Sequence, residues 1–254
     1  TVQAAIDAIT SAKAPSTIWT VILGDGVFGA AGLPAEININ GIGSGSIFGP
    51  LTTIGSGSTS QVTDAAIIGE SPAINHDGSY RLEVLTCNIS QTTDSGIPGL
   101  IYQTAGELFV DSCQLIYSTA VDNNTFGIII FNGTDPTNAV ISNNKIIGTI
   151  SGSTGDVFEV AEVRNTNSAS TFTFTNNNVQ VNLVGDSLTN YIFNRSPGSL
   201  STLDSRNNIF TISRTDTVNT QVDVIYDIDA ATSYSTNDTI YILDGNSSGI
   251  FASS

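Results

Sequence analysis

The sequence predicts an all-β fold in which the chain winds into a solenoid with three short strands per turn. The stretch AVISNNKIIGTI (139–150) places two asparagines between two apolar, strand-like runs. The same order of strand, polar corner and strand recurs around residues 87, 113, 177, 207 and 238, at steps of 26 to 33 residues. These segments carry strand signals and no helical period. A recurring unit of about thirty residues with strand patterning is typical of stacked β-coils.

A further strand-like segment lies between successive corners and would supply the third strand of each turn. These segments are residues 99–102, 127–131, 157–160, 190–193 and 224–228. In such a coil each turn lies about 4.8 Å above the previous one, so equivalent residues stack. A buried asparagine at a bend can bond backbone groups that the bend leaves unpaired, and it tolerates unusual φ and ψ. We therefore expect an internal ladder of corner residues, formed by Cys87, Cys113, Asn144, Asn177, Asn207 and Asp238.

The first residues predict a short helix that covers one end of the coil. Val2, Ala5, Ile6 and Ile9 share one helical face, and Thr1 is placed to cap the helix N-terminus. Together with the segments STIWTVILGDGVF and INGIGSGS that follow, this opening resembles the first coils of the pectin-lyase-like superfamily of right-handed parallel β-helix proteins.

The resemblance extends over essentially the whole chain. Members of that superfamily have an N-terminal helix that caps the core and an asparagine ladder at one corner. Asn144, Asn177 and Asn207 match the ladder, with Cys87 and Cys113 in its lower rungs. The resemblance implies a single right-handed parallel β-helix domain over residues 1–254, with a capping helix at 1–13 and rungs at 17–254. It does not fix an activity, because the superfamily includes lyases, hydrolases, esterases, phage tailspikes and adhesins.

The charge balance excludes several classes of partner. Seven Lys and Arg against 23 Asp and Glu give a formal net charge of −16. Such a surface repels phosphate backbones and anionic lipid, so we expect no nucleic-acid binding. It also disfavours polyanionic glycans unless cations bridge the two. No apolar run approaches the ~18 residues of a membrane span, so we expect no membrane insertion.

One column of predicted strands carries the charged side chains that best fit a catalytic site. Carboxylates one or two rungs apart could act as the acid and base on a glycan, with arginine binding an acidic sugar. The alternative is a solvated face whose opposite charges pair across rungs for at most about 1 kcal/mol. The motifs NTD, DD, GHG and RIK that likeness to a polygalacturonase would imply are absent. If the chain is an enzyme, its catalytic candidates are Glu159, Glu162, Asp227 and Asp229, and its ligand-binding candidates are Arg164, Asn194 and Arg195.

Metal binding has little support in the sequence. The single histidine, His76, lies in the loop-like stretch INHDGS, and we expect it to be an ordinary surface residue because a metal site needs further ligands. Aspartates recur once per period in the connections, where they either occupy turns or bind calcium. We expect no cofactor other than this possible calcium, whose candidate ligands are Asp94, Asp122, Asp156, Asp186, Asp216 and Asp244.

The two cysteines occupy equivalent positions of adjacent rungs. The Cα atoms of Cys87 and Cys113 would then lie about 4.8 Å apart, within the range of a disulfide. Their Cβ atoms would be about as far apart, slightly beyond the preferred distance. A pair of buried thiols and a mildly strained disulfide therefore both remain open.

These observations favour a non-catalytic extracellular module at a cell or virion surface, such as a coat, filament, fibre or adhesin subunit that can bind a glycan. A low share of charged residues (12%), the absence of catalytic motifs and connections of varied length favour it. The alternatives are a polysaccharide lyase or glycoside hydrolase acting on an acidic or neutral glycan, and a purely mechanical spacer. The segment SSGIFASS reads as a strand with little cover, so we expect a second copy or an adjacent domain to cover the C-terminal end.

Overall fold

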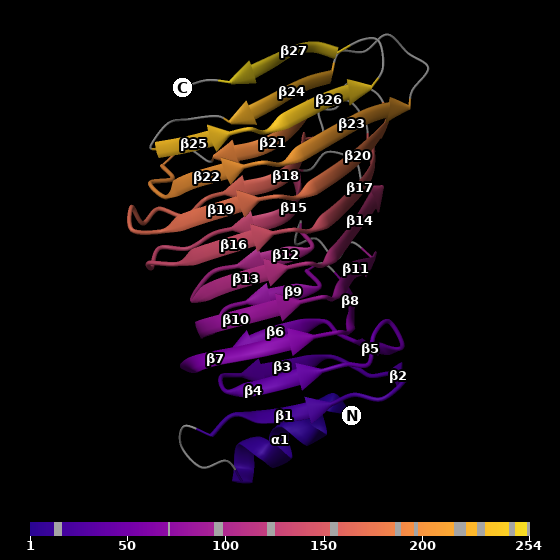
Figure 1. The fold of residues 1–254 in the computed structure, drawn as a ribbon, viewed down its shortest axis with the longest axis vertical. Coiled ribbons are helices and arrows are strands. Elements are labelled where there is room, and N and C mark those ends of the chain that lie inside the picture. The colour runs from indigo at the N-terminus through magenta and orange to yellow at the C-terminus, as the bar shows by residue number, and fades with distance from the viewer. Residues whose placement is uncertain are drawn as a thin grey trace.

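The computed structural model describes residues 1–12, 17–70, 72–93, 99–120, 125–152, 157–185, 189–195, 198–215, 222–227, 232–243 and 247–252. The described residues form one helix and three parallel sheets of nine strands each, stacked into a tall column with the helix at its foot (Figure 1). We call each turn of three strands a rung. The predicted all-β, three-faced parallel β-helix with an N-terminal helix is therefore confirmed.

The first sheet, sheet A, consists of every third strand, beginning with the first. In order they are β1 (Trp19–Ile22), β4 (Ile37–Asn40), β7 (Ser56–Thr63), β10 (Ser79–Leu85), β13 (Glu107–Asp111), β16 (Asn138–Ser142), β19 (Thr171–Thr175), β22 (Thr202–Arg206) and β25 (Thr232–Thr236).

Sheet B follows sheet A around each corner. Its strands are β2 (Gly26–Val27), β5 (Ser46–Phe48), β8 (Ala66–Glu70), β11 (Asn88–Thr93), β14 (Gln114–Ala120), β17 (Lys145–Gly152), β20 (Asn178–Gly185), β23 (Ile209–Thr215) and β26 (Thr239–Leu243).

Sheet C completes the rung and contains the predicted third strands. Its strands are β3 (Ala31–Pro34), β6 (Leu51–Ile54), β9 (Ile74–His76), β12 (Ile101–Gln103), β15 (Thr125–Phe131), β18 (Val157–Val163), β21 (Thr189–Arg195), β24 (Val222–Asp227) and β27 (Ser247–Ala252).

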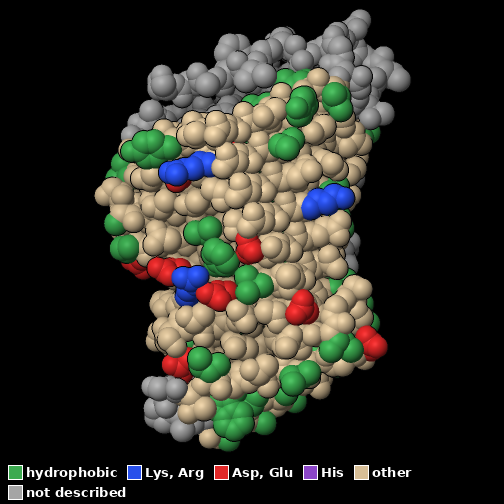
Figure 2. Space-filling model, in the orientation of Figure 1, with side chains coloured by type: hydrophobic (Ala, Val, Ile, Leu, Met, Phe, Trp, Pro, Cys, Tyr) green, Lys and Arg blue, Asp and Glu red, His purple; other side chains and the backbone are tan. Residues whose placement is uncertain are grey.

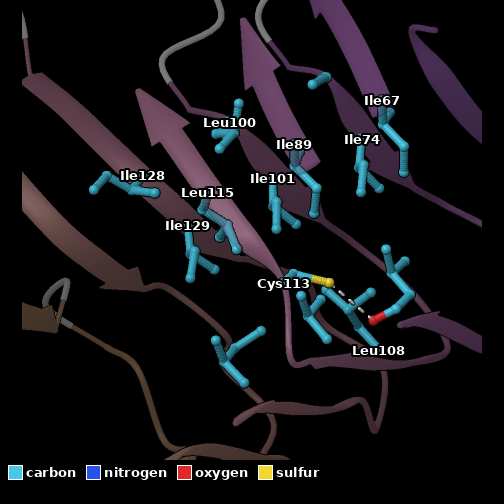
Figure 3. Packing of buried hydrophobic residues seen from close by; sticks show 14 of the residues in the cluster. Ile67, Ile74, Ile89, Leu100, Ile101, Leu108, Cys113, Leu115, Ile128 and Ile129 are labelled. Atoms are coloured by element: carbon cyan, nitrogen blue, oxygen red, sulfur yellow. Dashed lines mark hydrogen bonds between the residues drawn. The ribbon is translucent and has the colours of Figure 1, made fainter. Parts of the chain in front are cut away.

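The core is built from columns of identical or similar apolar side chains. Because successive strands pair in register, an inward residue of one rung lies directly over its equivalent in the rung below. Figure 3 shows two such columns, Ile67–Ile89–Leu115 in sheet B and Ile74–Ile101–Ile129 in sheet C. Higher rungs use aromatic rings, whose neighbouring centroids lie 5.4 to 6.5 Å apart, from Phe131, Phe172, Phe174, Phe193 and Phe210.

The helix α1 (Val2–Ala12) closes the lower end of this core, as expected. Val2 and Ile6 are buried, and Ala5 and Ile9 pack against the same cluster. The Thr1 hydroxyl accepts a hydrogen bond from the N–H of Ala4 at 3.1 Å, which is the N-cap bond predicted for it. Among the residues that the structure describes, no helix has the length and apolar character to span a membrane.

The corner between sheets A and B uses two consecutive residues with different tasks. The first is exposed or nearly so and adopts left-handed φ angles of 54° to 58° at Thr86, Ser112, Asn143, Asn176, Asn207 and Asn237. Asparagine adopts this conformation more readily than most residues, because its short side chain bonds locally. The second residue points inward and forms the ladder.

The ladder residues each accept a hydrogen bond from the backbone N–H of the rung below. The N–H of Cys113 donates to Asn144 Oδ1 at 2.8 Å, and that of Asn144 donates to Asn177 Oδ1 at 3.0 Å. The Asn177 N–H donates to Asn208 Oδ1 at 2.8 Å, and the Asn208 N–H donates to Asp238 Oδ1 at 2.7 Å. The ladder is confirmed, but its fifth member is Asn208. The prediction of Asn207 is wrong because Asn207 is the left-handed residue at φ 56° that precedes it.

The two cysteines are free thiols that stand in the ladder where asparagine would stand. The N–H of Cys87 donates to Cys113 Sγ at 3.3 Å, and the Cys113 thiol donates to the carbonyl of Val84 at 3.4 Å. An asparagine one rung higher makes the corresponding bond to Val110 with its amide nitrogen. A hydrogen bond with the Cys87 side chain and burial raise the pKa of Cys113 far above its ordinary value, and the backbone N–H of Cys87 opposes this shift only in part, so this thiol is not a reactive nucleophile.

Candidate functional site

On sheet C, two of the predicted catalytic carboxylates are buried. Glu159 and Glu162 of β18 are 0% and 3% exposed, and every residue from Phe158 to Val163 is buried. The expectation that these carboxylates lie on a solvated face is therefore wrong. Strand β18 is covered on both of its faces, and Glu162 accepts an ion-paired hydrogen bond from Nε of Arg164.

The remaining predicted members of that face are only partly described. Asn194 is the register partner of Glu162, and Arg195 is the register partner of Val163, so the predicted stacking of these strands is confirmed. The side chains of Asn194, Arg195 and Asp227, and the whole of Asp229, lie outside the described residues.

The calcium candidates Asp94, Asp122, Asp156, Asp186, Asp216 and Asp244 all lie outside the described residues. Within the described ranges, no three His, Cys, Asp or Glu side chains gather in a way that could hold a metal ion.

His76 is not a surface residue, because it ends strand β9, points into the core and is 0% exposed. Its Nδ1 lies 2.8 Å from Thr53 Oγ1, and its Nε2 lies 3.0 Å from the carbonyl oxygen of Glu107. A carbonyl only accepts, so these partners assign the proton to Nε2 and leave Nδ1 to accept the Thr53 hydroxyl. Burial lowers the pKa of His76 to about 4, although hydrogen bonds to the backbone of Glu107 and Tyr80 oppose this shift.

His76 belongs to a polar seam inside the column that the sequence did not reveal. Its register partner in the next rung is Gln103, which is also buried. The Gln103 amide donates to the carbonyls of Gly106 at 3.1 Å and Asn138 at 3.0 Å. Gly106 has φ 62°, and a Cβ there would meet two backbone oxygens at 2.3 Å, so only glycine lets this turn approach the seam. The seam thus fixes the starts of β13 and β16 from within.

The same two strands carry a groove on their outer side. The groove has a volume of about 470 Å³ and crosses β10, β13, β16 and β19 of sheet A. Two columns of outward residues line it, and each member lies over its register partner in the next rung. The first column is Arg81, Glu107, Asn138 and Thr171, and the second contributes Phe109, Val140 and Thr173.

Polar contacts hold the lower wall of the groove in place. The Arg81 guanidinium lies over the Phe109 ring, 5.4 Å from its centroid, and its Nε pairs with Glu83 Oε1 at 2.7 Å. Glu83 in turn accepts a hydrogen bond from Gln61 at 3.1 Å. Figure 2 shows this face of the molecule, where a small group of hydrophobic, basic and acidic side chains lies amid neutral polar ones. This chain of contacts orders the aromatic ring and the cation together.

Sequence reasoning did not find this groove, because the register partners that line it are 26 to 33 positions apart in the chain and none belongs to a motif. The available signal was the register. Once the ladder residues are aligned, counting back from each one in steps of two residues along the preceding strand identifies the residues that point outward.

No protein-family model matches the chain, and no curated protein sequence matches it. A similar solved structure is the A-module of the mannuronan C-5 epimerase AlgE6 of Azotobacter vinelandii. It is 14% identical with a TM-score of 0.20, and the alignment covers 100% of this chain and 94% of that one. A TM-score this low supports no argument about function. The parallel β-helix rests on the strand pairing, and membership of the pectin-lyase-like superfamily stays a prediction.

Proposed function

We propose that this chain is a non-catalytic extracellular module that serves a structural or adhesive role at a cell or virion surface. The observation that carries the proposal is the burial of Glu159 and Glu162. A group that cleaves a polymer must touch it, and these two carboxylates offer almost no surface to a substrate.

Three carboxylates on the outer face of sheet A, those of Glu83, Asp111 and Asp204, support the same conclusion. Glu83 is paired with Arg81, and Asp204 is paired with Arg206 at 2.6 Å. Burial acts to raise the pKa of Asp111, but hydrogen bonds from Ser142, Asn143 and Ser112 outweigh it and lower that pKa. A general acid on a glycan needs a raised pKa, so the environment of Asp111 suits a structural carboxylate.

The C-terminal end of the column supports the expectation of a partner. All five residues of β25 are exposed, and the residues of β26 alternate between exposed and intermediate. Exposed strands at the end of a solenoid present backbone groups that another strand can pair with. We propose that a second copy of this chain or a neighbouring domain covers this end. Light scattering at increasing concentration tests it, and a monomer at all concentrations would count against self-association.

Turnover assays test the non-catalytic role. The purified protein is incubated with neutral and acidic polysaccharides, and new reducing ends and unsaturated products are measured. We expect no product above the level of a boiled sample. Product that forms with the intact protein and disappears in Glu162→Gln would establish the alternative, a polysaccharide lyase or glycoside hydrolase working on sheet C.

A further inference from the structure

We propose that the groove on the outer face of sheet A is a binding site for a linear, neutral glycan that lies along the axis of the column. This inference rests on the proposed function, because it gives the adhesive module its ligand and the surface that takes it. The site lies on a different sheet from the acidic residues of β18.

The shape of the groove fits an extended chain. It crosses four successive strands of one sheet, which is a length of about 14 Å at the ordinary spacing between strands. Its floor beyond Phe109 is made of short outward side chains, Asn138, Val140, Thr171 and Thr173. The bulkier Arg81 and Phe109 form the wall at one end. A volume of about 470 Å³ lies within the usual range for small-ligand sites.

The chemistry of the lining fits sugar rings. The Phe109 ring and Val140 offer apolar surface for the C–H faces of a sugar, as aromatic side chains do in many ligand sites. Asn138, Thr171 and Thr173 offer amide and hydroxyl groups that both donate and accept hydrogen bonds, which matches sugar hydroxyls. Because outward residues repeat with every rung, these polar groups recur at about 4.8 Å along the groove. A repeating polymer meets a repeating surface.

Charge selects a neutral ligand. Arg81 is the basic residue of the lining, and its Nε is engaged by Glu83, while Glu107 adds a further negative charge. A carboxylated or sulfated sugar would compete with Glu83 for Arg81 and would face Glu107, on a chain whose net charge is −16. A neutral sugar meets neither penalty.

A peptide is a weaker candidate for the occupant. Extended peptides bind sheets by adding a strand at an open edge, where backbone groups are unpaired. The groove lies on the face of four paired strands, so it offers side chains and no free backbone edge.

Binding is tested on the full chain with soluble hexasaccharides. Neutral probes are the β-1,4-glucan, α-1,4-glucan and β-1,4-xylan series, and acidic probes are hexamers of galacturonate and mannuronate. Calorimetry gives affinity, and reducing-end assays on the same mixtures report turnover. We expect at least one neutral probe to bind, with an affinity that changes less than about twofold between roughly 0.05 and 0.5 M NaCl. Acidic probes should bind more weakly.

Two groove variants and two matched controls locate the site. Phe109→Ala removes the ring, and Thr173→Lys fills the floor; each should weaken binding of the neutral probe by about tenfold or more. The controls lie on the same rungs but on the outer face of sheet B. Ile116→Ala and Gln180→Lys make comparable exposed changes there and should leave binding unaltered.

The outcomes separate the site from the function. Equal binding by groove variants and controls would overturn the site and leave an adhesive module that binds elsewhere. Preference for an acidic probe, or binding of none of the probes, would overturn the neutral-glycan assignment. Product formation would instead overturn the proposed non-catalytic function. Loss of binding in the controls as well, with unchanged circular dichroism, would also reject the groove.

Discussion

Acid should weaken this fold through one residue, His76. Its neutral ring bonds to Thr53 Oγ1 through Nδ1 and to the Glu107 carbonyl through Nε2. Thr53 Oγ1 already accepts the N–H groups of Asp77 at 3.0 Å and Gly78 at 2.8 Å. A proton on Nδ1 would therefore need an acceptor that Thr53 can no longer supply. The charged ring would then lie in the core with an Nδ1–H that has no acceptor, because the Thr53 hydroxyl can only donate.

The size of the effect follows from the two pKa values. The unfolded chain binds the proton at the ordinary pKa of 6.5 and the folded chain at about 4. Between these values the unfolded state holds more protons, so the free energy of unfolding falls as the pH falls. The contribution of neutral His76 is complete above about pH 6.5 and is lost progressively down to about pH 4, a total of about 3 kcal/mol.

The assay compares the intact protein with His76→Gln. Glutamine occupies the equivalent position one rung higher, at Gln103, and its amide can meet both Thr53 and Glu107 without titrating. Denaturant unfolding at several pH values should show the intact protein losing about 3 kcal/mol more than the variant between pH 6.5 and 4. The comparison removes the contribution of the 23 acidic residues, which both proteins share.

An independent measurement uses the fact that the chain has one histidine. Its ring gives a single set of proton resonances, whose titration midpoint should lie near pH 4 in the folded protein. A midpoint near 6.5, or identical pH dependence of stability in the intact protein and His76→Gln, would refute the reasoning.

Two further predictions concern the corners, and a third concerns the connections between strands. Asn208→Ala should lower the free energy of unfolding by roughly 3 kcal/mol, because it leaves the buried N–H of Asn177 and the carbonyl of Phe174 without their hydrogen-bond partner. Asn207→Gly should change it by no more than about 0.5 kcal/mol, because glycine readily adopts the left-handed φ of this position. If the two variants lowered thermal stability equally, the assignment of Asn208 to the ladder would be wrong. Cys113→Asn should change stability by about 1 kcal/mol or less, because the amide can replace both thiol contacts; loss of the fold by circular dichroism would contradict this. If the connection aspartates bind calcium, a chelator should lower the melting temperature, and an unchanged value would dismiss the ion.

The period and the corners could be predicted because each rung repeats the same requirement. A bend between strands needs a left-handed residue followed by an inward polar one, and the double Asn at 143 and 144 displays both. The error of one residue at Asn207 arose because Asn207 and Asn208 are identical in type. Thr175 pairs with Arg206, so counting from the strand ends would have identified Asn208 as the inward residue.

Burial by neighbours could not be predicted. The Asp and Gly after His76 indicate a turn, and the turn exists, but the ring itself points back into the core. Glu159 and Glu162 lie in a strand whose outer face is covered, and local sequence does not report what covers a face. The groove depends on side chains from four rungs, so it appears only when the register is known.

The ladder has a direction. Each corner N–H finds its acceptor on the side chain of the following turn, so a turn is complete only once its successor is in place. Removing the last rung would leave the corner N–H of the rung below it without an acceptor. That rung would be destabilised in turn, so the effect would spread one rung at a time toward the helix. We expect the column to fray from the top in whole-coil steps, with the helix end the last to open.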